Sequence, residues 1–169
     1  MKRRVVFVLI FGCLLTFAAL GEEQIQNGDA LVRAMHTRYE KNWYATMTFT
    51  QKSTTYNPGG ATKVDTWYEA GMLPGNLRID FGPPADGNGV ILTDGNAISF
   101  KNGAEAGTRP SVNMLLVLGF DVYRQPPETT IAQLKQEGID LAKIHEETWQ
   151  GDPVYVTGAD KGDLKSNRR

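Results

Sequence analysis

The chain is almost without cysteine, because Cys13 is the only one among its 169 residues. If a leader containing Cys13 is removed, disulfide bonds, thiol nucleophiles and cysteine metal cages are excluded. Only two histidines occur, His36 and His145, and the sequence around His145 lacks the His-Glu-x-x-His spacing of a zinc helix. There is also no nucleophile elbow, phosphate-binding loop or complete dinucleotide fingerprint. We therefore expect no catalytic residue, no metal site and no cofactor.

A surplus of positive charge is also missing. The chain has 18 Lys and Arg against 19 Asp and Glu. The first 21 residues hold three basic and no acidic residues, so residues 22–169 keep 15 basic against 19 acidic residues, a net charge of −4. A mildly acidic body argues against a nucleic-acid partner. The length of residues 22–169 fits a single domain with a core of its own.

The N-terminus has the three parts of a secretory signal peptide over 1–21. A positively charged start is followed by uncharged residues over 5–20 and by small residues at Ala19 and Gly21. Two alternatives are a transmembrane anchor, for which the apolar run is short, and lipidation at Cys13, which lies inside that run. The pattern predicts export to the periplasm.

Apolar residues in the rest of the chain predict a helix followed by an antiparallel meander. The expected elements are a helix over 25–40, strands over 44–51, 64–70, 76–81, 89–93 and 97–101, a loop over 104–110, helices over 112–120 and 126–137, and strands over 144–149 and 154–158. Asn27 or Asp29 is expected to cap the first helix. This gives an α+β fold with six or seven strands.

Several of the expected strands have one apolar face, and the segment over 112–120 is strongly apolar. A helix laid over a curved sheet either fills that face as a core or, where the filling is incomplete, leaves a binding pocket. The pattern by itself leaves both interpretations open.

The order of four motifs resembles the LolA family, the periplasmic carriers of bacterial lipoproteins. The motifs are Phe49-Thr50-Gln51, Trp67 before the turn and strand over 74–81, the hairpin over 90–100, and Pro110 followed by Leu115-Leu116. Residues 119–123 and 148–156 are similar to a poorly characterised subgroup of that family. The four motifs cover roughly residues 25–120.

The resemblance implies an unclosed antiparallel half β-barrel with helices over its concave face. It also implies a non-enzymatic function in outer-membrane lipoprotein sorting, in which an apolar cavity binds the acyl chains of lipoproteins or lipids. An inner-membrane release complex and an outer-membrane acceptor would be the partners. The residues carried over as cavity lining are Met47, Phe49, Trp67, Leu77, Ile79, Phe81, Ile98 and Phe100 on the sheet and Leu115, Leu116 and Leu118 on the lid helix.

Two features depart from the family pattern. Leu73 stands where the enterobacterial carrier has an arginine that latches the lid, and Arg78 is in the outward register of its strand, so it is no substitute. The chain also ends at Arg169, where the family continues through further strands, which predicts a C-terminal truncation with an unpaired edge strand. The alternative function is a periplasmic sensor or scaffold of the same fold that binds a regulatory protein.

Overall fold

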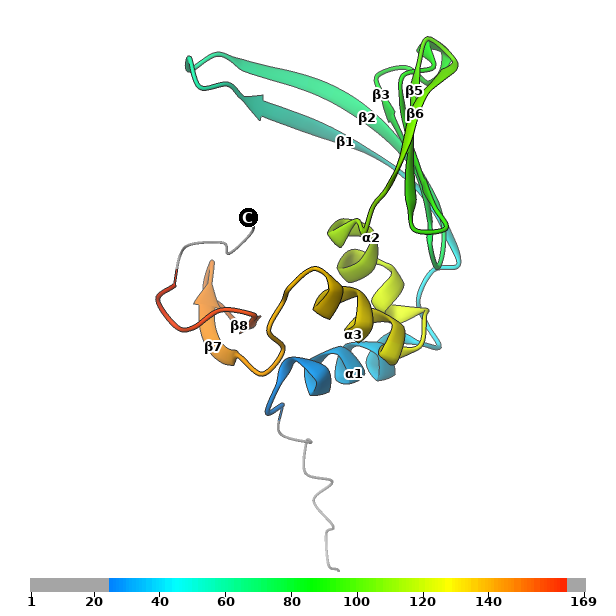
Figure 1. The fold of residues 1–169 in the computed structure, drawn as a ribbon. Coiled ribbons are helices and arrows are strands. Elements are labelled where there is room, and N and C mark those ends of the chain that lie inside the picture. The colour runs from blue at the N-terminus through cyan, green and yellow to red at the C-terminus, as the bar shows by residue number, and fades with distance from the viewer. Residues whose placement is uncertain (1–24, 164–169) are drawn as a thin grey trace, which may run out of the picture.

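A computed structural model describes residues 25–163, and the predicted signal peptide with Cys13 lies outside them. The described chain is an α+β structure with three α-helices and an antiparallel sheet that does not close (Figure 1). Of the helices, α2 packs on the sheet, whereas α1 and α3 pack together in a separate layer. Its elements are α1 (Gly28–Tyr39), β1 (Thr46–Tyr56), β2 (Thr62–Met72), β3 (Asn76–Phe81), η1 (Pro84–Asp86), β4 (Gly89–Thr93), β5 (Asn96–Lys101), β6 (Ala104–Pro110), α2 (Met114–Gly119), η2 (Asp121–Tyr123), α3 (Pro127–Gln136), β7 (Ile144–Trp149) and β8 (Asp152–Thr157).

The six-stranded sheet is the predicted meander, with strands β1 to β6 each beside the next in the chain. The turn between β4 and β5 uses Asp94 and Gly95, both at positive φ, which suits a two-residue hairpin. β1 and β2 are longer than predicted and form a hairpin that extends beyond the other strands (Figure 1). This hairpin bends toward the side on which α2 lies.

The predicted loop over 104–110 was wrong, because this segment is strand β6 and pairs with β5. All seven of its side chains are exposed, so it has none of the apolar alternation that marks a strand in the sequence. Backbone hydrogen bonds to β5 determine its conformation. The described chain therefore has eight strands, one more than the upper end of the predicted range.

Two hydrophobic clusters form the core, and α2 contributes to both. Leu116 of α2 is buried in the cluster on the sheet, and Met114 packs against the cluster between α1 and α3. The buried members of the sheet cluster are Leu73, Leu77, Ile79, Leu92, Ala97 and Leu116. Those of the helical cluster are Val32, Val122, Ile131, Leu134 and Leu141. A short helix therefore holds the sheet and the helical layer together.

β7 and β8 form a separate two-stranded sheet beside α1. The Gly28 N–H donates to the Leu141 carbonyl at 2.7 Å, and a Cβ on Gly28 would come within 2.6 Å of the Thr157 hydroxyl. A larger residue at the start of α1 would clash with Thr157, so glycine is required there. The close approach that glycine allows joins the β7–β8 hairpin to α1. Asn27, one of the two predicted caps, accepts from the Ala30 N–H at 2.8 Å. None of the helices found between residues 25 and 163 is long and apolar enough to span a bilayer.

Candidate functional site

The two faces of the six-stranded sheet follow from the pairing register, because directly opposed residues point to the same side. We call the side that meets α2 the inner face and the other side the outer face. The inner face carries Met47, Phe49, Gln51, Trp67, Glu69, Gly71, Leu77, Ile79, Phe81, Val90, Leu92, Ala97 and Ser99. The outer face carries Thr48, Thr50, Tyr68, Ala70, Arg78, Asp80, Ile91, Ile98 and Phe100.

Six of the residues predicted to line a cavity share the inner face. They are Met47, Phe49, Trp67, Leu77, Ile79 and Phe81. Leu77 and Ile79 are buried with Leu116 of α2, while Met47 and Trp67 pack at the edge of the same cluster. These six residues therefore lie on the side of the sheet that meets α2.

The placement of Ile98 and Phe100 on this face was wrong. Ala97 opposes Leu92 and Ser99 opposes Val90, so these two smaller residues of β5 point inward. Ile98 and Phe100 consequently lie on the outer face, where Phe100 lines a separate pocket. The large apolar side chains of Ile98 and Phe100 led us to expect them on the inner face. Pairing with β4, and not side-chain size, determines which residues of β5 face inward.

The lid residues also differ from the expectation. Only Leu116 is buried, whereas Leu115 and Leu118 are 48% and 36% exposed. Leu116 packs with Leu77 and Leu92, and Phe120 lies against the same cluster. The end of the inner face beneath α2 is thus filled by side chains and is not the hollow that we expected there.

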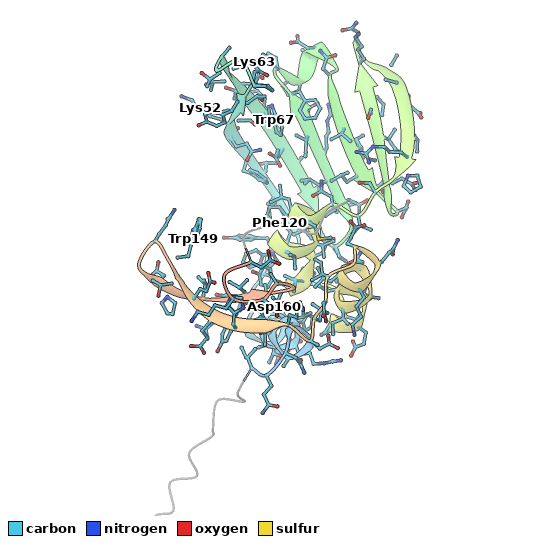
Figure 2. The ribbon with its side chains drawn as sticks, turned by 60° about the vertical axis from the view of Figure 1, so that its left-hand side comes forward. Lys52, Lys63, Trp67, Phe120, Trp149 and Asp160 are labelled. Atoms are coloured by element: carbon cyan, nitrogen blue, oxygen red, sulfur yellow. The ribbon has the colours of Figure 1, made fainter. Side chains whose placement is uncertain are left out.

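Beyond α2 the inner face stays apolar but is partly open. The rings of Trp67 and Phe81 are opposed across β2 and β3 with centroids 4.8 Å apart, and Phe81 is 45% exposed. Phe49 contacts Phe120 with centroids 5.9 Å apart. Figure 2 shows Trp67 on the sheet above Phe120, which follows α2. Aromatic rings therefore border an accessible apolar surface at the end of the packed cluster.

A carboxylate lies within this apolar surface, and sequence reasoning missed it. Glu69 stands between Phe49 and Ile79 in the register of the inner face, and it is 3% exposed. Neither of its carboxylate oxygens has a hydrogen-bond partner among residues 25–163. Burial raises the pKa of Glu69, because removing the carboxylate from water disfavours its charged form. The sequence signal was an acidic residue in register with Trp67 and Gly71 on β2.

A second buried acid, Asp121, joins the helical layer to the sheet. Its Oδ1 accepts the Gly75 N–H of the turn between β2 and β3 at 3.0 Å. Burial raises the pKa of Asp121, and the hydrogen bond from Gly75 partly offsets that rise. Leu73, which we expected to replace a latch arginine, is buried in the sheet cluster. The turn between β2 and β3 is therefore joined to the helical layer by the hydrogen bond from Gly75 to Asp121.

Replacing Asp121 by alanine is expected to lower the free energy of unfolding by about 1 kcal/mol, the typical net value of one hydrogen bond. Urea unfolding followed by circular dichroism measures the loss. Asp121→Asn is the matched control, because its amide oxygen can still accept the Gly75 N–H. Equal losses in both variants would contradict the role of this hydrogen bond.

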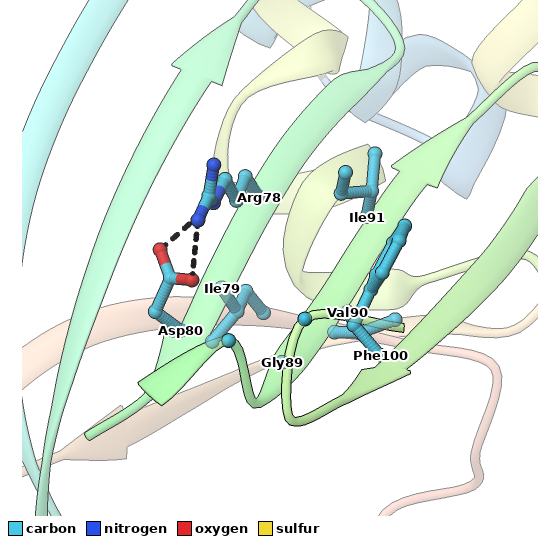
Figure 3. A pocket seen from close by; sticks show the side chains of 9 residues that line it. Arg78, Ile79, Asp80, Gly89, Val90, Ile91 and Phe100 are labelled. Carbon is cyan, nitrogen blue, oxygen red and sulfur yellow. Dashed lines mark hydrogen bonds and ion pairs between the residues drawn. The ribbon is translucent and has the colours of Figure 1, made fainter. Parts of the chain in front are cut away.

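The outer face has its own pocket, of about 220 Å³. Arg78 donates two hydrogen bonds to Asp80 at 2.9 and 2.8 Å on its wall, and Ile91 and Phe100 supply apolar surface (Figure 3). Arg78 thus points outward, as the alternation of its strand predicted. Asp80 already neutralises the guanidinium, so this pocket offers little net charge to a ligand.

The histidines lie in separate parts of the structure. His36 pairs with Glu40 at 3.2 Å on α1, and His145 pairs with Glu147 at 2.9 Å on β7. The residues that the structure describes contain no cluster of three potential metal ligands among His, Cys, Asp and Glu. Neither histidine belongs to the inner face.

No family model, curated protein or solved structure matches the chain. Its function must therefore be inferred from the chemistry of its own surfaces. The inner face, with its packed end beneath α2, its open aromatic end and its buried carboxylate, is the candidate site.

Proposed function

We propose that the protein is a non-enzymatic periplasmic carrier of the LolA type, which binds the acyl chain of a lipoprotein or lipid on the inner face of its sheet. The observation that carries the proposal is the apolar surface that continues past α2. There, Phe81 remains 45% exposed although its ring packs on Trp67. A contiguous exposed apolar surface, of the kind formed here by Phe81 and Trp67, is where an apolar ligand can bind.

The energetics of chain burial favour this function. Each methylene group removed from water contributes about 0.8 kcal/mol. Several methylene groups laid along Trp67, Phe81 and Phe120 would therefore offset the cost of ordering a flexible chain. A partly open surface gives reversible binding, which a carrier needs because it must release its cargo. Neither step requires a catalytic group.

Decanol, an uncharged alkyl chain, is the probe that tests this proposal. We expect the wild-type protein to bind decanol in isothermal titration calorimetry, and Phe81→Glu to weaken binding about tenfold or more, equivalent to about 1.4 kcal/mol or more. Phe81 is partly exposed, so a charge at this position can reach water and the domain should still fold. Circular dichroism verifies that it does.

Tyr68→Glu is the matched control for this experiment. Tyr68 is 38% exposed and neighbours Trp67 on β2, but it lies on the outer face. Its replacement should leave the affinity for decanol within about twofold, which is a small fraction of the energy of one buried side chain. No binding of decanol to the wild-type protein, or equal losses in the two variants, would refute the inner face as the binding surface.

The open edge of the sheet favours a protein partner as the second candidate. β1 has eleven residues and, within the described chain, pairs only with β2. Its free edge could accept a strand from a regulatory protein. Native mass spectrometry of protein purified from the cell envelope distinguishes the two functions, because a carrier retains lipid whereas a scaffold retains a polypeptide.

A further inference from the structure

Glu69 is anomalous in its surroundings. It is 3% exposed, and its two oxygens have no partner among the residues described. Buried polar groups in folded proteins are almost always hydrogen-bonded, and an unsatisfied one calls for a specific explanation. An apolar side chain at this position would continue the surface formed by Phe49 and Ile79 without that cost.

No neighbouring side chain among the residues described donates a hydrogen bond to Glu69. The adjacent inner-face positions on β1 and β3 are occupied by Met47, Phe49, Gln51, Leu77, Ile79 and Phe81, and Gln51 is the only polar residue among them. α2 has only apolar side chains, with the sequence MLLVLG. A basic residue on the same face of β2, Lys63, already pairs with Asp65 at 2.9 Å. Both carboxylate oxygens of Glu69 are therefore left to accept hydrogen bonds from a bound molecule.

The position of Glu69 indicates which chemical groups such a molecule would need. On β2, Glu69 lies between Gly71, which opposes Leu77 at the packed end, and Trp67, which borders the open end. A hydrogen-bond donor that meets the carboxylate would leave an attached alkyl chain to extend along Trp67 and Phe81. A nitrogen cation is the strongest such donor, because charge-assisted hydrogen bonds are about twice as strong as neutral ones.

We propose that the inner face selects amphiphiles whose alkyl chain carries an amine, with the ammonium group bound to Glu69 and the chain along Trp67 and Phe81. This assignment rests on the proposed function and specifies its ligand class. Free fatty acids are disfavoured at the same site, because their carboxylate would be placed against that of Glu69. The inner face then discriminates by head group as well as by chain.

Decylamine, decanol and decanoate test this assignment, because they share a chain length and differ in charge. At pH 7 decylamine is a cation and decanoate an anion. Calorimetry with the wild-type protein is expected to give a dissociation constant for decylamine about tenfold or more below that for decanol, and the weakest binding for decanoate. In Glu69→Gln the dissociation constants of decylamine and decanoate should differ by no more than about threefold, while decanol should still bind.

Asp65→Asn is the matched control, since it removes one negative charge from the same face of β2 at a position already paired with Lys63. It should preserve the preference for decylamine. If the wild-type protein binds decanol but shows no preference for decylamine, or if Glu69→Gln keeps the preference, the role of Glu69 is refuted while the carrier function stands. If decanol does not bind, the carrier function itself fails.

Discussion

Replacing Leu77 by alanine is expected to lower the free energy of unfolding by about 2–5 kcal/mol, the range for large-to-small changes in a packed core. Leu77 is 1% exposed and belongs to the cluster that joins the sheet to α2 through Leu116. Its loss would leave a cavity opposite Leu92, its neighbour in the register, and the β-strands around it can close such a space only in part. Urea denaturation followed by circular dichroism measures the change.

Leu118→Ala is the control for this prediction, because Leu118 belongs to α2 but is 36% exposed. It should cost less than about 1 kcal/mol, since much of its side chain already contacts water. A loss for Leu77→Ala no larger than that for Leu118→Ala would mean that α2 does not pack on the sheet as described.

Replacing Glu69 by glutamine is expected to raise the free energy of unfolding at pH 7, because it removes a charge that burial disfavours while a neutral polar group stays in its place. The variant keeps the shape of the side chain and removes its charge. Most substitutions destabilise proteins, so a gain at a buried position would be diagnostic. Urea denaturation of both proteins over a range of pH measures the effect.

The pH dependence has a defined sign. Burial raises the pKa of Glu69 in the folded protein above its ordinary value of 4.5, so the folded state retains a proton that the unfolded state has released. Wild-type stability should therefore fall as the pH rises from 4.5 through the raised pKa, relative to Glu69→Gln. Below pH 4.5 both states are protonated, and the difference between the two proteins should become small and constant.

The surroundings of Glu69 mean that the expected difference in pH dependence comes from Glu69 itself and not from a neighbouring titratable group. No titratable side chain of β1, β3 or α2 occupies a neighbouring position on the inner face. Parallel pH profiles for the wild-type protein and Glu69→Gln would contradict the buried, unpaired carboxylate. A carboxylate that lowers stability and increases ligand selectivity would be an example of the trade between stability and function at binding sites.

Local sequence patterns determined much of the described chain. Asp94-Gly95 located the hairpin between β4 and β5, and Asn27 located the start of α1, because these turn and cap residues act through their own backbone. Alternating apolar residues also placed Leu77 and Ile79 on the buried side of β3, since every second side chain of a strand points the same way. Such signals are contained within a few consecutive residues.

Tertiary structure decided what depends on pairing and packing between distant segments. β6 exists because β5 offers hydrogen bonds to it, and Phe100 faces outward because Ser99 opposes Val90 across the sheet. α2 fills one end of the inner face, and Glu69 on the same face is buried without a partner among the residues described. The sequence by itself determined the meander and its main apolar face, whereas burial and registry, which arise only when the elements meet, created the candidate site.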